Sequence, residues 1–144
     1  MIERSNRDIG YLDEEVHTTF SFTQTVKAGN TVYFSGVAPL RGSLADLQIV
    51  GENDIRAQLE WCLEILRRCL DEQKATFHHL VAQTVYTLDI DELAKHADVF
   101  ATAFAGEAPA ATWLQVERLF HPAQLVEITG IAVLDQEMSQ DHGQ

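Results

Sequence analysis

Glu127 stands inside an apolar run near the C-terminus, where a charged side chain is unusual. Almost all of the residues at 125–134 are apolar, and burying an unpaired charge is costly. Two interpretations are open. In the first, Glu127 is a partly desolvated carboxyl group that orients or activates a hydrolytic water. In the second, it is a structural carboxylate paired with an arginine such as Arg118 or Arg41.

Ser35 and Gly36 follow an extended run of β-branched and aromatic residues at 31–34. The Ser35 hydroxyl could donate a hydrogen bond to a ligand carboxylate or carbonyl, or it could satisfy the backbone of the turn. No Ser-His-Asp spacing supports a nucleophilic role for it. Gly36 has no side chain, so another group can approach the backbone closely there. We therefore take Glu127 and Ser35 as the candidate catalytic residues.

The six histidines and two cysteines do not form a metal-binding pattern. Neither His-x-x-x-His nor Cys-x-x-Cys occurs, and these spacings place two ligands on one metal. Cys62 and Cys69 lie on one predicted helix with Cα atoms about 10 Å apart, which is too far for a disulfide. The turn at 28–30 predicts a hairpin and no phosphate-binding loop. We expect no metal, no cofactor and two small buried thiols.

Hydrophobic periodicity predicts the elements that must position these residues. From 55 to 70 the apolar residues recur at helical spacing, and Glu64 and Arg68 can pair on the opposite side. A second helical stripe runs from 93 to 104. The expected elements are a hairpin of strands at 18–26 and 31–34, a loop at 41–51, a helix from 53 or 54 to 74, a strand at 80–88, a helix from 89 or 91 to 106, and strands at 111–119 and 125–134.

Each of the two amphipathic helices needs its apolar side covered, and one sheet can cover both. We predict an α+β fold, a two-layer sandwich of one mixed β-sheet with two helices on one face. It forms a single domain at 18–134, between an N-terminal segment at 1–17 and a polar flexible tail at 135–144. The strand at 125–134 is apolar on both sides, whereas a half-exposed strand alternates. We therefore expect self-association to bury the second face.

The charge balance excludes several classes of partner. Lys and Arg number 10 and Asp and Glu number 22, a formal net charge of −12 over 144 residues. Because nucleic-acid and anionic-membrane contacts need clustered basic residues, we expect neither partner. No apolar stretch approaches the roughly 20 residues that cross a bilayer. The segment at 1–11 lacks the apolar core of a signal peptide, so we expect a cytoplasmic protein that binds a small metabolite.

Five segments stand in a characteristic order: Val26-Lys27-Ala28-Gly29-Asn30, Tyr33-Phe34-Ser35-Gly36-Val37-Ala38-Pro39, Thr84-Val85-Tyr86, Pro109-Ala110 and Leu125-Val126-Glu127-Ile128. In order and spacing they resemble the RidA family, also called YjgF or reactive intermediate deaminase. The resemblance spans 20–134. It implies a chorismate-mutase-like fold and a homotrimer with a small-molecule cleft at each subunit interface, which agrees with an apolar second sheet face.

The resemblance also implies an activity. Family members with the full motif hydrolyse enamines and imines formed from amino acids and release ammonia and a 2-keto acid. In them an arginine after Pro-Ala grips the substrate carboxylate, and Ala111 stands there in this chain. Trp113 replaces a small residue, and Phe22 and Ala97 stand where a tyrosine and an asparagine are common. The chain thus resembles the arginine-lacking branches, with these positions retained: Gln24, Ser35, Gly36 and Glu127.

The implied substrate-binding residues are Phe22, Gly36, Arg41, Ala111 and Trp113. Phe22 and Trp113 would line an apolar, aromatic cleft, although Trp113 could instead fill the core. Arg41 follows the Ser-Gly-x-x-Pro turn, where it either replaces the lost arginine or is a solvated loop residue.

Two functions remain open from the sequence. One is a hydrolytic deaminase of a small enamine or imine, with water as the nucleophile. The other is a non-catalytic trimer that binds a small molecule in the same cleft. Some relatives carry the name ribonuclease, but the acidic charge opposes the approach of a polyanion to this chain.

Overall fold

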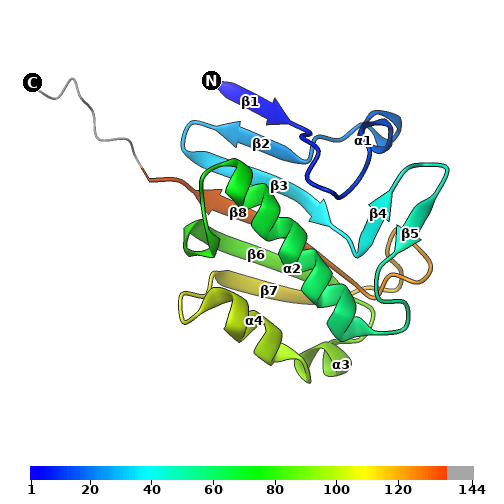
Figure 1. Ribbon diagram of the computed structural model, residues 1–144. Coiled ribbons are helices and arrows are strands. Elements are labelled where there is room, and N and C mark those ends of the chain that lie inside the picture. Colours follow the sequence, from blue (N-terminus) through cyan, green and yellow to red (C-terminus); the bar gives the residue numbers. More distant parts are fainter. Residues whose placement is uncertain (136–144) are drawn as a thin grey trace, which may run out of the picture.

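A six-stranded mixed sheet forms the centre of the molecule (Figure 1). The computed structural model describes residues 1–135. β6 and β7 pair in parallel, and the other pairs in this sheet are antiparallel. In spatial order the strands are β1 (Ile2–Ser5), β2 (Thr25–Ala28), β3 (Thr31–Val37), β8 (Val126–Val133), β6 (Leu80–Thr87) and β7 (Ala110–Gln115).

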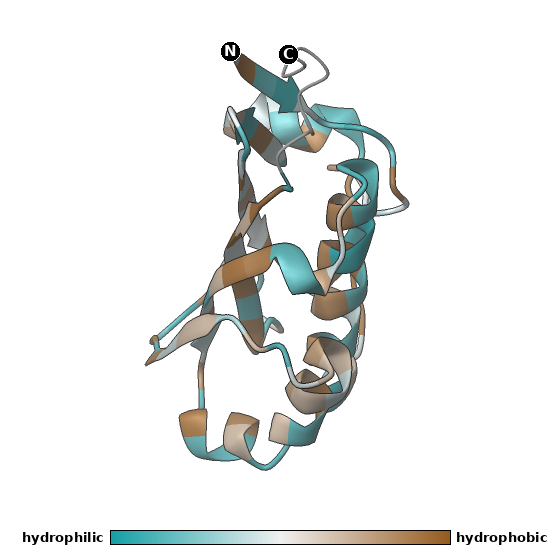
Figure 2. Cartoon of the chain, turned by 90° about the vertical axis from the view of Figure 1, so that its left-hand side faces the viewer, coloured by the Kyte–Doolittle hydropathy of each residue, from teal (hydrophilic) through white to brown (hydrophobic). Residues whose placement is uncertain are grey.

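Helices cover one face of this sheet. The long α2 (Ile55–Glu72) and the shorter α4 (Ala97–Phe104) lie on the same side, as the views in Figures 1 and 2 agree. The α+β expectation, with one mixed sheet and helices on one face, is confirmed. No helix among the described residues has the length and apolarity needed to cross a bilayer.

α2 forms where its sequence pattern predicts it. The Asp54 side chain accepts a hydrogen bond from the backbone N–H of Ala57 at 3.0 Å, which caps the first turn. The predicted apolar stripe faces the sheet, and its members are buried. On the outer side Glu64 pairs with Arg68 at 2.8 Å, as expected, and also with Arg67 at 2.7 Å. The buried stripe is Ile55, Leu59, Cys62, Leu63, Leu66, Cys69 and Leu70.

The face of the sheet opposite α2 is not covered by the described part of this chain. We call it the open face. Side chains alternate along β8, so Ile128 points toward the helices and Glu127 and Ile131 point outward. Tyr33 and Leu114, on the same outer side, remain 47% and 45% exposed. The open face presents Tyr33, Tyr86, Leu114, Glu127, Thr129 and Ile131 among its residues.

The first 20 residues differ from the expectation. Residues at 1–17 do not form a separate segment, because β1 pairs with β2 and Tyr11 is buried in the core. The start of the strand expected at 18–26 belongs instead to α1 (Glu14–Phe20), and β2 begins only at Thr25. The run Thr18-Thr19-Phe20 has β propensity, but packing of Val16 and His17 overrides it.

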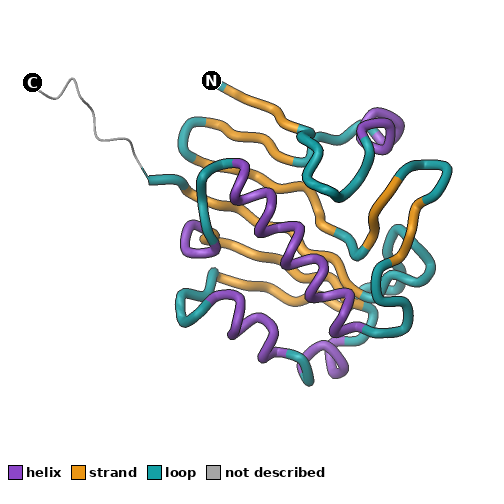
Figure 3. Tube along the Cα trace, in the orientation of Figure 1, coloured by secondary structure: helices purple, strands orange, loops and turns teal. Residues whose placement is uncertain are grey.

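The loop expected at 41–51 contains a hairpin of β4 (Leu40–Gly42) and β5 (Leu47–Ile49). Gly42 has a φ of +108°, and a Cβ there would lie 2.5 Å from the Asp46 carbonyl oxygen, so the turn requires glycine. Leu12 pairs with Gly42. Figure 3 shows the resulting arrangement, with α1 and the β4–β5 hairpin at the same end of the sheet.

Three further features of the helices and strands differ from the predicted ranges. The second expected helix is interrupted between α3 (Ile90–Ala94) and α4. There the backbone N–H groups of Lys95 and His96 donate hydrogen bonds to the carbonyls of Glu92 and Leu93, three residues back, which is the spacing of a 3₁₀ turn. A short 3₁₀ turn, η1 (Phe77–His79), precedes β6. β7 ends at Gln115 rather than at 119. The expected tail lies outside the described residues from 136 onward.

Candidate functional site

Glu127 is the second residue of β8 and lies on the open face, with its carboxylate against the backbone of Gly36. An ideal Cβ at Gly36 would overlap Glu127 Oε2 and lie 2.8 Å from Cδ. Glycine at this position therefore gives the carboxylate its space. The β-bulge of β3 between Phe34 and Val37 places Gly36 beside Glu127.

Gln124 holds the other oxygen of this carboxylate. Its Nε2 donates to Glu127 Oε1 at 3.0 Å and to the Val126 carbonyl at 3.2 Å. Its Oε1 accepts from the backbone N–H of His121 at 3.2 Å. Gln124 is fully buried, so its rotamer is fixed by packing as well as by these hydrogen bonds. The side-chain amide orients the carboxylate and leaves Oε2 available.

The loop that carries Gln124 is itself held by α2. Gln58 donates from Nε2 to the Ala123 carbonyl at 3.0 Å, and its Oε1 accepts from the Leu125 N–H at 2.7 Å. Neither Gln58 nor Gln124 was expected at the site from the sequence. A signal existed for Gln58, since it stands beside Leu59 on the buried side of an otherwise apolar helix stripe.

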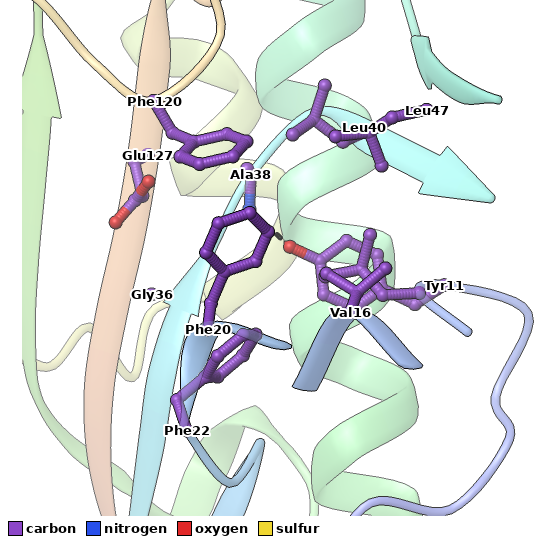
Figure 4. Close-up of a pocket in the computed structure, with 11 residues that line it drawn as sticks. Tyr11, Val16, Phe20, Phe22, Gly36, Ala38, Leu40, Leu47, Phe120 and Glu127 are labelled. Carbon is purple, nitrogen blue, oxygen red and sulfur yellow. Dashed lines mark hydrogen bonds between the residues drawn. The ribbon is translucent and has the colours of Figure 1, made fainter. Parts of the chain in front are cut away.

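A cavity of about 240 Å³ opens beside Glu127 (Figure 4). Its walls come from α1 and the segment before it, from β3 and the residues that follow, from the β4–β5 hairpin, and from the loop before β8. Glu127 is the charged residue among them, and Tyr11 contributes the one other polar side chain. The lining residues are Tyr11, Leu12, Val16, Phe20, Phe22, Gly36, Ala38, Leu40, Leu47, Phe120 and Glu127.

Tyr11 brings a hydroxyl group to this cavity. The phenol oxygen accepts a hydrogen bond from the Ala38 N–H at 2.8 Å (Figure 4). Burial raises the pKa of Tyr11, and the nearby charge of Glu127 raises it further. The hydroxyl thus keeps its proton near neutral pH and can donate it in a hydrogen bond. Tyr11 was not expected at the site, because residues 1–17 were predicted to form a separate N-terminal segment.

Aromatic rings form much of the wall. Phe20, at the end of α1, meets Phe120 edge to face, with ring centroids 5.3 Å apart. Phe22 packs on the imidazole of His17 at 4.7 Å. Both Phe20 and Phe120 remain about half exposed, so they stand where the cavity meets the surface. Among the predicted binding residues, Phe22 and Gly36 thus line the cavity.

Ser35 and Arg41 lie elsewhere. The Ser35 hydroxyl donates to the Thr23 carbonyl at 2.5 Å, and Ser35 is not a lining residue. Arg41 Nε donates to Gln48 Oε1 at 3.2 Å on the exposed side of the hairpin. Arg118 donates to the Leu119 carbonyl at 3.3 Å. Within residues 1–135 neither arginine forms an ion pair with Glu127, which removes the pairing considered for it.

Trp113 and Ala111 lie on the opposite face of the sheet from Glu127. Trp113 pairs with Val85, a buried residue beneath the helices, whereas Glu127 pairs with Tyr86 on the open face. The Trp113 ring packs 5.5 Å from the ring of Phe100 in α4. Trp113 therefore fills the space between β7 and α4 and does not line this cavity, contrary to the cleft-lining expectation. Ala111 shares that side of β7.

Metal-ligating side chains are not gathered at the cavity. Over residues 1–135, no group of three or more His, Cys, Asp or Glu side chains is placed to hold a metal ion. Cys62 and Cys69 are unpaired and buried, as expected. Burial raises the pKa of Cys69 to about 12 and that of Cys62 well above its usual value.

Comparisons with known proteins agree with this fold. The family model described as Endoribonuclease L-PSP matches residues 13–134. A RutC family protein of Pyrococcus abyssi is 28% identical over 111 residues, which cover 77% of this chain and 84% of the relative.

Solved structures of similar proteins have the same fold as this chain. The structure of RidA from the Antarctic bacterium Psychrobacter sp. has a TM-score of 0.69 at 25% identity, covering 79% of this chain and 89% of that one. A member of the YjgF/YER057c/UK114 family from Mycobacterium tuberculosis has a TM-score of 0.77 at 23% identity, over 93% and 100% of the two chains. The match of the family model over most of the chain and the shared fold show that this protein belongs to the RidA (YjgF) family.

Proposed function

We propose that this protein hydrolyses a small enamine or imine in the Glu127 cavity, with water as the nucleophile. The observation that carries the proposal is the carboxylate itself. One oxygen is fixed by Gln124, and the other lies over Gly36 at the edge of an apolar cavity. A carboxylate oriented in this way can hold a water and accept its proton as the water attacks the C=N carbon.

The surroundings of Glu127 favour such a step. Apolar walls lower the local dielectric, so an interaction between the carboxylate and a polar reacting group is stronger than in bulk water. The Tyr11 hydroxyl can donate to the oxygen that becomes the carbonyl. Ser35 keeps a supporting role in this proposal, since its hydroxyl donates a hydrogen bond to the Thr23 carbonyl and so links β3 to the segment before β2.

We further propose that the active form is a cytoplasmic homotrimer. The open face carries exposed Tyr33 and Leu114 together with uncharged Thr129 and Ile131. Such a face is suited to burial against further copies. Since Glu127 lies on that face, a neighbouring subunit would complete the cleft around it.

A second function is supported by the cavity lining, whose described residues include no Lys, Arg or His that could hold a substrate carboxylate. The same cavity could bind a small apolar molecule and release it unchanged. A nuclease activity is disfavoured, because the chain carries a net charge of −12 and its cavity is apolar.

The test is ammonia release from imines generated in situ by amine and amino-acid oxidases, followed with a coupled dehydrogenase. Wild-type protein should accelerate the release, and Glu127→Ala should abolish the acceleration. Glu117→Ala, which removes an exposed carboxylate outside the cavity, is the matched control. Equal ammonia release by wild type and Glu127→Ala across the panel would leave only the binding function.

A further inference from the structure

Resting on the proposed function, we infer that the cavity selects a cationic apolar ligand: the protonated imine of an aromatic or aliphatic amine that carries no carboxylate. The substrate would bear its positive charge beside Glu127 and its hydrocarbon body against the phenylalanine rings. The reaction balances as R₂C=NH₂⁺ + H₂O → R₂C=O + NH₄⁺, so the products are an aldehyde or ketone and ammonium.

The charge of the cavity lining favours a cationic ligand. The described lining residues include the carboxylate of Glu127 and no Lys, Arg or His. An amino-acid-derived imine would bring a second carboxylate into this apolar space. Two like charges at short range in low dielectric repel strongly. An iminium ion has the opposite sign, and Glu127 would be its counter-ion.

The cavity wall opposite the carboxylate is aromatic and suits the same ligand. Figure 4 shows the rings of Phe20, Phe22 and Phe120 around the space beside Glu127. The face of an aromatic ring attracts a cation placed within about 6 Å of its centroid. The same rings offer apolar contact to the rest of the ligand. The wall therefore accepts both parts of an apolar cation.

The size of the cavity also fits a small ligand of this kind. A cavity of about 150 Å³ lined by apolar side chains holds one benzene molecule. At about 240 Å³ this cavity has room for one ring and a short chain. Tyr11, whose oxygen already accepts from Ala38, offers a single O–H donor and thus suits the oxygen of the attacking water or the product carbonyl.

The net charge of the whole protein also favours a cationic ligand. A net charge of −12 attracts cations to the surface and repels anions, which raises the encounter rate for an iminium ion relative to a carboxylate. This long-range effect weakens with added salt. Selection inside the cavity, between Glu127 and the rings, does not depend on it.

Binding of three stable probes of similar size tests the inference by calorimetry at pH 7: benzylammonium, benzyl alcohol and phenylacetate. We expect wild type to bind benzylammonium at least tenfold more tightly than benzyl alcohol, and phenylacetate most weakly. Glu127→Gln keeps an acceptor for Gln124 and should reduce the preference for the cation to less than twofold. Glu117→Gln, an equal loss of charge at an exposed site, should retain it.

Equal affinity for the alcohol and the cation, or tighter binding of the carboxylate, in wild-type protein would overturn the inference without any variant. The ligand class and the proposed catalytic function can be rejected independently of each other. Hydrolysis of imines without a preference for cations would reject the ligand class alone. Benzylammonium binding that depends on Glu127, with no ammonia released from any imine, would reject the catalytic proposal and keep the ligand class.

Discussion

Replacing Gly36 by alanine tests whether this glycine exists to admit Glu127. The three heavy atoms nearest to an added Cβ all belong to Glu127, and Cδ would have to withdraw from 2.8 Å to at least 3.4 Å. The carboxylate must therefore leave its position and its bond to Gln124. A distorted rotamer costs about 0.5–1.5 kcal/mol, and the lost hydrogen bond about 1 kcal/mol.

The backbone itself does not require glycine at this position. The φ of Gly36 is not in the left-handed region, so alanine can adopt the same backbone conformation. At such a position Gly→Ala stabilises a protein by about 0.4–1 kcal/mol, because it lowers the conformational entropy of the unfolded chain. In wild type we thus expect Gly36→Ala to destabilise by about 1 kcal/mol net. In the Glu127→Ala background, where all three nearest atoms are gone, the same change should stabilise by about 0.4–1 kcal/mol.

The assay is a double-mutant cycle by urea unfolding at one fixed protein concentration, since the proposed trimer would make stability concentration-dependent. The two backgrounds should differ by about 1.5–2.5 kcal/mol in the effect of Gly36→Ala. If Gly36→Ala has the same effect with and without Glu127, the contact between the two residues is not the reason for the glycine.

Three further outcomes follow. Burial lowers the pKa of His17, and this outweighs the opposite effects of the neighbouring Gln24 and Glu14, so stability should fall as pH decreases below about 6.5, where the unfolded chain binds the proton first; His17→Phe should flatten the pH dependence of the urea midpoint between pH 5 and 7. Cys62 and Cys69 are buried with raised pKa values, so a thiol reagent at pH 8 should label neither in the native protein and both in urea; labelling in the native state would show that α2 opens. Gln124→Leu should lower kcat for imine hydrolysis by about tenfold, the usual loss when a supporting group of a site is removed, while circular dichroism stays unchanged; an unaltered kcat would remove Gln124 from the positioning of Glu127.

The fold was predictable where one periodicity dominates. The stripe from Ile55 to Leu70 has helical spacing, a capping Asp54 and no competing pattern, and α2 has those limits within two residues. β8 was equally clear, because its continuous apolar run and its β-branched residues both indicate a buried strand. In both cases local propensity and burial indicate the same structure.

The cavity was only half predictable. Gly36 and Glu127 follow from their sequence context, but Phe20 reaches the site at the end of α1 and Tyr11 in the segment before it, and tertiary packing places both. Trp113 stayed open between cleft and core in the sequence, because β7 has no polar alternation and only its pairing with Val85 decides which face it joins. Face assignment in such a strand depends on register, which a single sequence does not provide.

The most direct test of the central claim is kcat/KM for hydrolysis of an imine generated from benzylamine, measured for wild type, Glu127→Gln and Glu117→Gln. If Glu127 activates the attacking water, Glu127→Gln should lower kcat/KM by about 10²–10⁴-fold, the range for loss of a general base. Glu117→Gln should stay within about twofold of wild type, as expected for an exposed site. A Glu127→Gln enzyme as active as wild type would contradict the assignment of Glu127 as the group on which catalysis depends.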